Sequence, residues 1–167
     1  MAISVIRAPA VLGPGDSATY PLFSNLAKGI LVAPGSARNF CFSIIDVADL
    51  SKLLVALAKV TTPVSERIAP YGHARLDWPS IAQSAQRTLN RPIRTLYIPP
   101  WLMKIAAHAV DFFARLSGKA QVISADKLGE VNAGDWIAEH PVENPVPLDE
   151  TMRRCLAPFG NLNAKDA

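Results

Sequence analysis

The sequence has few cysteines, few histidines and little net charge, and these shortages argue against several classes of protein. Its 167 residues include 2 cysteines and 3 histidines and carry a formal net charge of +3. Cys41 and Cys155 stand far apart and form no redox or zinc spacing, so we expect reduced core side chains. His73, His108 and His140 also lie too far apart for the short spacings of common metal sites. We therefore expect no metal.

Long hydrophobic runs and clusters of basic residues are also lacking. No apolar run approaches the roughly 20 residues that span a bilayer, and no basic stretch followed by an apolar segment opens the chain. The basic residues are scattered, whereas a nucleic-acid surface needs clustered cations. No serine stands in a Gly-x-Ser-x-Gly turn, which argues against a hydrolase. We expect a cytoplasmic protein that binds no nucleic acid, with residues 1–167 forming a single unit.

An apolar run opens the chain and is its most informative positive feature. The run from Ile3 to Ala8 predicts a strand buried in a sheet that helices cover. Such a sheet is assembled from earlier strands, and the sequence contains none before Ile3. We interpret the chain as the second half of a larger fold.

Hydrophobic periodicity, caps and breakers predict further strands and helices in alternation. Strands are predicted at Phe40 to Ile45, Arg67 to Tyr71 and Ile93 to Ile98. Helices are predicted after the N-cap residues Thr19, Asp46 and Asp77, and at Trp101 to Leu116 and Leu148 to Leu156. Connections without regular structure are predicted at Ile30 to Asn39 and Ala138 to Pro147.

Three of these helices carry specific expectations. Asp46 and Asp49 predict an acidic variant of the capping box before four leucines at helical spacing, Leu50, Leu53, Leu54 and Leu57. The helix from Trp101 to Leu116 has a narrow polar stripe, so its wide apolar face needs a partner: the protein core, a second subunit or a membrane surface. The core is the favoured partner. In the last helix, Asp149 with Arg153 and Glu150 with Arg154 are expected to form solvent-facing pairs.

Several segments resemble, in order, motifs of the extended short-chain dehydrogenase/reductase family, which includes NAD(P)-dependent epimerases, dehydratases and hydroxysteroid dehydrogenases. Arg7 to Gly15 resembles the family's Arg-x-Pro-x-x-Tyr-Gly-Pro segment, and Phe42 to Leu50 resembles Ser-x-Ile-His-Val-x-Asp-Leu. Arg67 to Pro99 resembles the strand, helix and strand that follow. Asp135-Trp136 and Pro147 to Thr151 resemble segments near the family's C-terminus. The resemblance covers nearly the whole chain.

Two motifs of that family are missing from the sequence. One is the Gly-x-x-Gly-x-x-Gly turn, whose backbone amides approach the coenzyme pyrophosphate. The other is the Tyr-x-x-x-Lys pair for proton transfer, since Tyr20, Tyr71 and Tyr97 are not followed by a lysine at that spacing. The resemblance thus implies an α/β fold with a partial Rossmann-like sheet of late strands and a mostly helical substrate-binding lobe. NAD or NADP is the implied cofactor, but we expect the chain alone neither to bind it nor to catalyse a reaction.

The resemblance also implies a binding site, although no catalytic residue. A loop on the nicotinamide side, formed only with the missing half, is expected at Pro9, Ala10, Val11 and Leu12. Substrate-binding positions are expected at Gly13, Arg38 and Asp46. Arg38 matches a position from which a basic side chain reaches a substrate phosphate, but a lone loop arginine is more often solvated. Asp46 replaces a family histidine and is fully explained as a helix cap, worth about 0.5–2 kcal/mol.

The departures from the motif favour an apolar substrate. Sugar-nucleotide members often carry asparagine where Ala10 or Val11 stands, because an amide binds hydroxyl and phosphate groups. Leu12 replaces the usual tyrosine. We expect the substrate-binding part of an NAD(P)-dependent oxidoreductase or epimerase acting on a hydrophobic alcohol or ketone, or alternatively on a sugar nucleotide. The possible partners are a second copy of the chain or a nucleotide-binding half. The second hypothesis is a non-enzymatic interaction module, a degenerate reductase half that buries its first strand and its amphipathic helix against another protein, and a peripheral membrane protein is the third.

Overall fold

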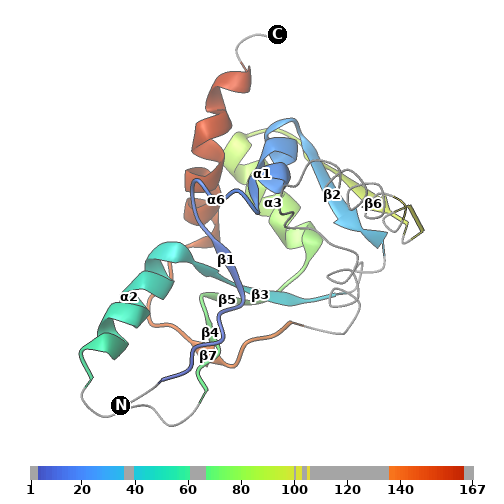
Figure 1. Cartoon of the computed structure of the whole chain (residues 1–167). Helices are drawn as coiled ribbons and strands as arrows, with labels where there is room; N and C mark the ends of the chain where they lie inside the picture. Colours follow the sequence, from blue (N-terminus) through green and yellow to red (C-terminus); the bar gives the residue numbers. More distant parts are fainter. Residues whose placement is uncertain are drawn as a thin grey trace, which may run out of the picture.

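The chain has a mixed α/β architecture, in agreement with the fold class predicted from the sequence (Figure 1). The computed structural model describes residues 4–35, 40–60, 67–99, 101–102, 105 and 136–163. The helices are α1 (Tyr20–Ala27), α2 (Val47–Ala58), α3 (Trp78–Leu89), α6 (Leu148–Leu156) and the 3-10 helix η2 (Ala157–Asn163). The strands are β1 (Ala10–Leu12), β2 (Ile30–Pro34), β3 (Phe42–Asp46), β4 (Pro70–Tyr71), β5 (His73–Leu76), β6 (Arg94–Ile98) and β7 (His140–Pro141).

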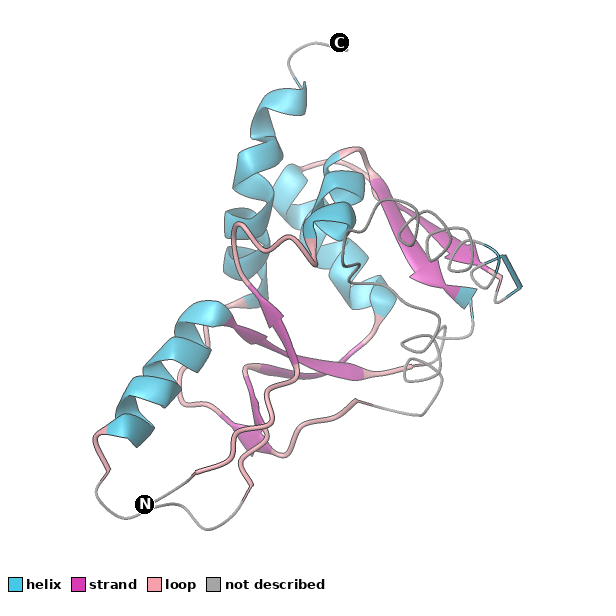
Figure 2. Cartoon of the chain, viewed as in Figure 1, coloured by secondary structure: helices cyan, strands magenta, loops and turns pink. Residues whose placement is uncertain are grey.

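The strands form small sheets rather than one continuous sheet, as Figure 2 shows. In the largest, the order is β1-β3-β5, with β1 parallel and β5 antiparallel to the central strand β3. The parallel pair β2-β6 and the parallel pair β4-β7 form separate sheets. Strand β1 lies at an edge, and among the described residues no strand pairs with its other side.

The core lies where α6 packs against α1 and α3 (Figure 1). Met152 and Leu156 of α6 are buried, and the spacing of four residues places them on one face of the helix. They contact a cluster that also contains Phe23, Leu26 and Ile81. Burying a side chain of this size contributes about 1.5–3 kcal/mol, so this three-helix contact anchors the C-terminal helix to the rest of the fold.

Two predicted helix caps are confirmed. The Asp46 carboxylate accepts a hydrogen bond from the Ala48 backbone N–H at 2.8 Å, and the Asp77 carboxylate accepts one from the Ser80 N–H at 2.8 Å. The third cap prediction is wrong in its chemistry, because Thr19 precedes α1 but its side chain makes no capping bond. These two aspartates therefore fix where α2 and α3 begin.

The opening strand begins later than predicted. The strand was expected from Ile3 to Ala8, but β1 spans Ala10–Leu12, and within residues 4–9 only Ile6 forms a bridge, with Ile68. Val5 is 49% exposed, so the expected burial is wrong for the described part of this segment. An apolar composition indicates that a segment can be buried. It does not specify whether the element that buries it belongs to the same chain.

Three strands lie where the sequence predicted loops or nothing. Strand β2 occupies part of the predicted connection, because its apolar run pairs with β6 and Pro34 falls at its last position, where a strand tolerates proline. Strand β7 lies in the predicted loop, and β5 was not predicted. Each is short and is stabilised by a partner distant in sequence, so local periodicity gives a weak signal.

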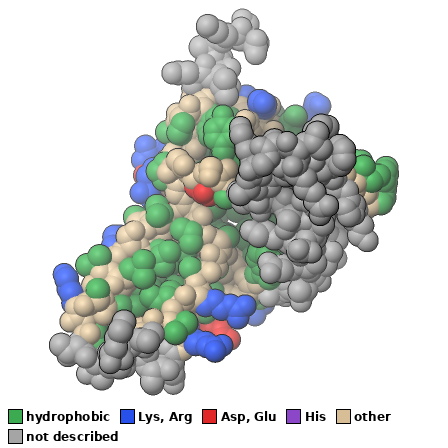
Figure 3. All heavy atoms as spheres, in the orientation of Figure 1, with side chains coloured by type: hydrophobic (Ala, Val, Ile, Leu, Met, Phe, Trp, Pro, Cys, Tyr) green, Lys and Arg blue, Asp and Glu red, His purple; other side chains and the backbone are tan. Residues whose placement is uncertain are grey.

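Helix α2 is confirmed as a helix, and of its four leucines Leu50, Leu53 and Leu57 are half-buried. Leu54 is 47% exposed and Val55 is 55% exposed, and the buried residue of this helix is Asp49. The Asp49 carboxylate accepts from the Val146 backbone N–H at 2.7 Å and lies 3.3 Å from the Lys52 Nζ, instead of completing a capping box. Figure 3 shows hydrophobic side chains gathered on the surface over α2.

Ion pairs of α6 also differ from the prediction. Asp149 pairs with Arg87 of α3 at 2.8 Å instead of with Arg153, which pairs with Glu150 at 2.6 Å. The expected pair of Glu150 with Arg154 is present only at 3.9 Å. Most of the predicted helix from Trp101 to Leu116 lies outside the described residues. In the part of the chain that the structure describes, no helix is long and apolar enough to cross a membrane.

Candidate functional site

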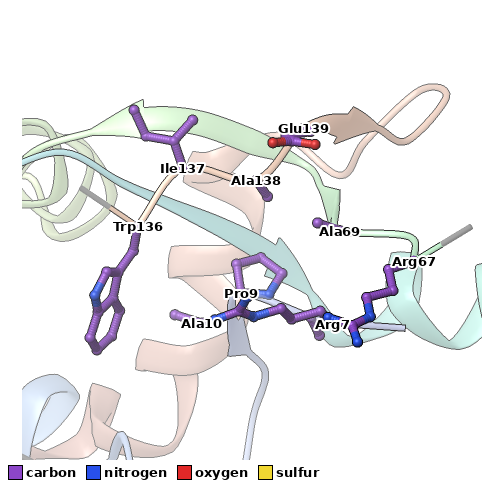
Figure 4. A pocket seen from close by; sticks show the side chains of 10 residues that line it. Arg7, Pro9, Ala10, Arg67, Ala69, Trp136, Ile137, Ala138 and Glu139 are labelled. Atoms are coloured by element: carbon purple, nitrogen blue, oxygen red, sulfur yellow. The ribbon is translucent and has the colours of Figure 1, made fainter. Parts of the chain in front are cut away.

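A cavity of about 830 Å³ opens beside the segment that leads into β1. Three separate parts of the chain line it, and Figure 4 shows their side chains. The lining residues are Arg7, Ala8, Pro9, Ala10, Arg67, Ala69, Trp136, Ile137, Ala138 and Glu139.

Backbone hydrogen bonds hold these three parts together. The Arg7 N–H donates to the Ile68 carbonyl at 2.8 Å, and the Glu139 N–H donates to the Ala69 carbonyl at 3.2 Å. The segment around residue 68 therefore lies between the other two. The Ala138 N–H also donates to the buried Ser43 Oγ at 2.9 Å, and this bond attaches the segment around residue 138 to β3.

The cavity combines apolar surface with a few charged groups. Pro9, Ala10 and Ala138 contribute apolar surface, and the indole of Trp136 is 45% exposed. Among the lining residues, the ionisable side chains are two arginines and the carboxylate of Glu139. The described lining contains no serine, cysteine, histidine or tyrosine, and Glu139 is its one carboxylate. The composition of this lining suits the binding of a ligand with both apolar and charged parts.

The cavity contains part of the predicted nicotinamide-side loop. Pro9 and Ala10 line it, whereas Val11 and Leu12 are not among its lining residues. Leu12 is 4% exposed and belongs to the hydrophobic core. The predicted loop is thus Pro9 followed by strand β1, with its first two residues at the cavity and its last residue in the core.

Gly13 and Arg38, both predicted to bind substrate, are not in the cavity lining. A Cβ atom on Gly13 would lie 2.5 Å from Val47 Cγ1 and 2.9 Å from Val47 Cβ, so the chain passes α2 too closely for a side chain. This contact gives the glycine a packing role. Arg38 lies outside the described residues.

Asp46, the third predicted substrate-binding residue, is buried at 3% exposure and fully engaged within the chain. Its carboxylate accepts hydrogen bonds from Thr151 Oγ1 at 2.6 Å and from the Arg154 guanidinium at 2.5 Å, besides the capping bond from Ala48. Burial acts to raise the pKa of Asp46, but the bonds from Thr151, Ala48 and Arg154 hold that pKa below its ordinary value. The charge therefore ties β3 and α2 to α6.

Sequence reasoning missed part of the cavity lining. Arg67 and Glu139 were not singled out, although each stands close to a segment that the structure places at the cavity. The sequence indicated these residues only weakly. Arg7 and Arg67 stand beside apolar residues of two predicted strands, and it is the pairing of those two segments that brings the arginines to the same cavity.

The described histidines and cysteines have other surroundings. His73 Nε2 lies 2.8 Å from the Val146 carbonyl oxygen, and His140 Nδ1 accepts from the Ala69 N–H at 3.1 Å. Burial raises the pKa of the Cys155 thiol to about 11, which keeps it protonated at neutral pH. Across the described ranges, no group of three or more acidic, histidine or cysteine side chains is placed to hold a metal ion.

Comparison with solved structures shows the fold to which this arrangement belongs. The UDP-glucuronic acid 4-epimerase of Bacillus cereus superimposes with a TM-score of 0.60 at 12% identity, over 97% of this chain and 46% of its own. An NAD-dependent NDP-hexosamine 5,6-dehydratase gives 0.54 at 18% identity, over 98% and 47%. The UDP-glucose 4-epimerase of Bifidobacterium longum, solved with NAD+ and UDP, gives 0.56 at 15% identity, over 97% and 48%.

A curated relative is more similar in sequence. The ceramide reductase of Caulobacter vibrioides is 26% identical over 144 residues, which are 86% of this chain and 45% of that protein. No family model matches the chain.

The described chain spans about half the length of each of these proteins. That coverage agrees with the interpretation of the sequence as a C-terminal half, in which the late motifs of the extended reductases occur in order and the early ones are missing. The chain has the α/β fold seen in these NAD-dependent epimerase and dehydratase structures, and it covers about half of that fold.

Proposed function

We propose that the chain is the substrate-binding half of an NAD(P)-dependent reductase of the extended short-chain type. The observation that carries this proposal is its coverage of 46–48% of three NAD-dependent or NAD-bound neighbours, combined with about 97% coverage of its own length. The reaction would transfer a hydride from the coenzyme to a carbonyl carbon and a proton to the carbonyl oxygen, giving an alcohol. The coenzyme and the proton donor would be held by the other half.

Strand β1 is where we propose that the other half joins. It is an edge strand of the β1-β3-β5 sheet, and its outer side has no strand partner among the described residues. Exposed edge strands invite pairing with another strand. Because Pro9 and Ala10 lie at the same place, a strand added there would bring bound coenzyme next to the cavity.

The proposed substrate is an apolar, lipid-like ketone. The parts of the cavity nearest β1 are the side chains of Ala8, Pro9 and Ala10, which offer no hydrogen bond to a sugar hydroxyl. The relative with the higher sequence identity, 26%, is a ceramide reductase, whose name indicates a lipid. Apolar lining and this relative support the same substrate class.

Two alternatives rest on specific observations. The neighbours from Bacillus cereus and Bifidobacterium longum were solved with UDP-glucuronic acid and with UDP, which supports a sugar-nucleotide substrate. The apolar surface of α2, with Leu54 and Val55 exposed, supports an interaction module that binds another protein.

A chimaera distinguishes these possibilities. The segment of the Caulobacter ceramide reductase that this chain does not match would be joined to the 167 residues, and oxidation of NADPH and NADH would be followed. We expect turnover with a ceramide-type ketone and little with a UDP-sugar. Turnover with the UDP-sugar alone would transfer the proposal to sugar nucleotides.

Controls make a negative result informative. Each half is assayed alone, and the chimaera is checked for cooperative unfolding and for coenzyme binding. A chimaera that folds and binds coenzyme but reduces neither substrate would contradict the reductase proposal and favour the interaction module.

A further inference from the structure

Two arginine side chains of the cavity have no ion-pair partner among the described residues. Arg7 and Arg67 both line it, and neither forms an ion pair with a described residue. Glu139, the one carboxylate of the lining, lies across the cavity from them (Figure 4). The side chains of the two arginines lie next to each other along one side of the same view.

The pairing of two chain segments explains why the arginines share a side. Ile6 and Ile68 are direct partners in a parallel bridge, and the Arg7 N–H donates to the Ile68 carbonyl at 2.8 Å. Side chains alternate between the two faces of a strand, so Arg7 and Arg67, each one residue from the bridge, both project to the face opposite the isoleucines. The fold thus places two exposed cationic side chains on the same face of adjoining segments, an arrangement that favours an anion near both.

Between the arginines and Trp136 the cavity is lined by apolar side chains. Pro9 and Ala10 lie between the arginines and Trp136 (Figure 4). The indole is 45% exposed and packs edge-on against Phe40, with ring centroids 6.2 Å apart. A ligand that fills this cavity therefore meets two cations at one side, apolar surface towards Trp136, and the Glu139 carboxylate across from the cations.

We propose that this cavity binds an amphiphilic anion, with its phosphate or carboxylate group on Arg7 and Arg67. The apolar part of the ligand lies over Pro9 and Ala10 towards Trp136. Guanidinium groups bind phosphate and carboxylate oxygens through paired hydrogen bonds, so the two arginines suit such anions. The inference deepens the proposed function, on which it rests for its biological role, because it adds an acidic group to the expected lipid-like ligand.

Binding to the 167-residue chain tests the site without coenzyme or turnover. Hexyl phosphate, inorganic phosphate and hexanol are titrated by calorimetry and by the fluorescence of Trp136, with Trp136→Phe identifying the signal. We expect saturable binding of hexyl phosphate, weaker binding of inorganic phosphate and none of hexanol. Arg7→Gln and Arg67→Gln are each expected to weaken hexyl phosphate binding about tenfold.

Arg94→Gln is the matched control, because Arg94 is exposed on β6 and does not line the cavity. Flotation with phosphatidylcholine vesicles, with and without phosphatidic acid, then separates a membrane headgroup from a free ligand. Binding that survives in the Arg7→Gln Arg67→Gln double variant, or that falls equally in Arg94→Gln, would overturn the proposal. Absence of binding to both hexyl phosphate and phosphatidic acid would also overturn it, and circular dichroism confirms that each variant is folded.

The two proposals fail separately. An inactive chimaera together with arginine-dependent binding of hexyl phosphate leaves the anion site in place and removes the reductase function. An active chimaera whose turnover and binding do not respond to Arg7→Gln or Arg67→Gln leaves the reductase function and removes the anion site.

Discussion

Asp46 carries several structural tasks with one carboxylate. It caps α2 through the Ala48 N–H, and it accepts hydrogen bonds from Thr151 and Arg154 of α6. The residue stands where the resembling family has a histidine, which made a ligand role reasonable at the level of sequence. In the structure its carboxylate is committed to contacts within the chain, so any contact with a substrate would have to replace one of them.

Asp46→Asn is expected to lower the free energy of unfolding by about 2 kcal/mol. The asparagine keeps a capping oxygen, but it removes the negative charge that Arg154 faces. Urea unfolding followed by circular dichroism measures the loss. Arg153→Gln is the control, because its pair with Glu150 lies at the surface, and its expected effect is below about 1 kcal/mol. Equal losses in the two variants would contradict this role of Asp46.

The same carboxylate makes stability depend on pH. The pKa of Asp46 is lowered in the folded chain, so its stabilising contribution is present above the pKa of the unfolded chain and is lost as the pH falls through the folded pKa. The pKa of Asp149 is lowered in the same direction by Arg87 and Ser84. We expect the free energy of unfolding to fall below about pH 5, and to fall less steeply in Asp46→Asn. Parallel curves for the two proteins would contradict the linkage.

At the scale of elements, the close contact of the turn after β1 with α2 sets the position of that helix. Gly13 lies so close to Val47, the first residue of α2, that a methyl group on Gly13 would overlap the valine side chain. Any side chain at this position must move the helix or the turn, so the spacing between β1 and α2 depends on the glycine.

Gly13→Ala is expected to destabilise the chain by about 1–3 kcal/mol, because its methyl group would overlap two carbons of Val47. Val47→Gly removes both carbons, so the alanine should cost much less in that background. Gly160→Ala serves as a control, since a Cβ there has no atom within 4 Å. Additive losses in the Gly13/Val47 double-mutant cycle, measured by urea unfolding, would show that the contact is not the cause.

Helix α2 presents apolar residues that the chain does not cover. Leu54→Ser and Val55→Ser are expected to change the free energy of unfolding by less than about 0.5 kcal/mol, because both side chains are exposed. Leu26→Ala, at a buried site, should cost about 2–5 kcal/mol. A large loss in the serine variants would contradict the exposed placement. Light scattering of the same proteins shows whether copies of the chain associate through α2.

Local signals in the sequence predicted some elements well and others poorly. The caps at Asp46 and Asp77 and the strand at Arg94–Ile98 were predictable, because capping and short-range periodicity depend on neighbouring residues. Strand β5 and the exposure of Leu54 were not. The first depends on pairing with a distant segment, and the second depends on which element covers the helix, which periodicity does not specify.

The candidate site was predictable in the same partial way. Pro9 and Ala10 were identified through a motif and do line the cavity. Arg67 and Glu139 join them only because the segments around residues 6, 68 and 138 are hydrogen-bonded side by side. Such a register is a property of the folded sheet, and no spacing within the sequence encodes it.

At the scale of the whole molecule, we propose that the chain is one half of a fold whose other half lies outside these 167 residues. The chain matches 46–48% of the length of three epimerase and dehydratase structures, and its β1 edge is open among the described strands. The cavity lining offers apolar surface, two arginines and one carboxylate, Glu139. We therefore propose that substrate recognition belongs to this half and that coenzyme binding belongs to the other.

Calorimetric titration with NAD+ and NADP+ tests this division most directly. The 167-residue chain is titrated alone and then joined to the unmatched segment of the Caulobacter ceramide reductase. We expect no saturable coenzyme binding to the chain alone and stoichiometric binding of one coenzyme by the joined protein. Saturable binding of either coenzyme to the chain alone would contradict it.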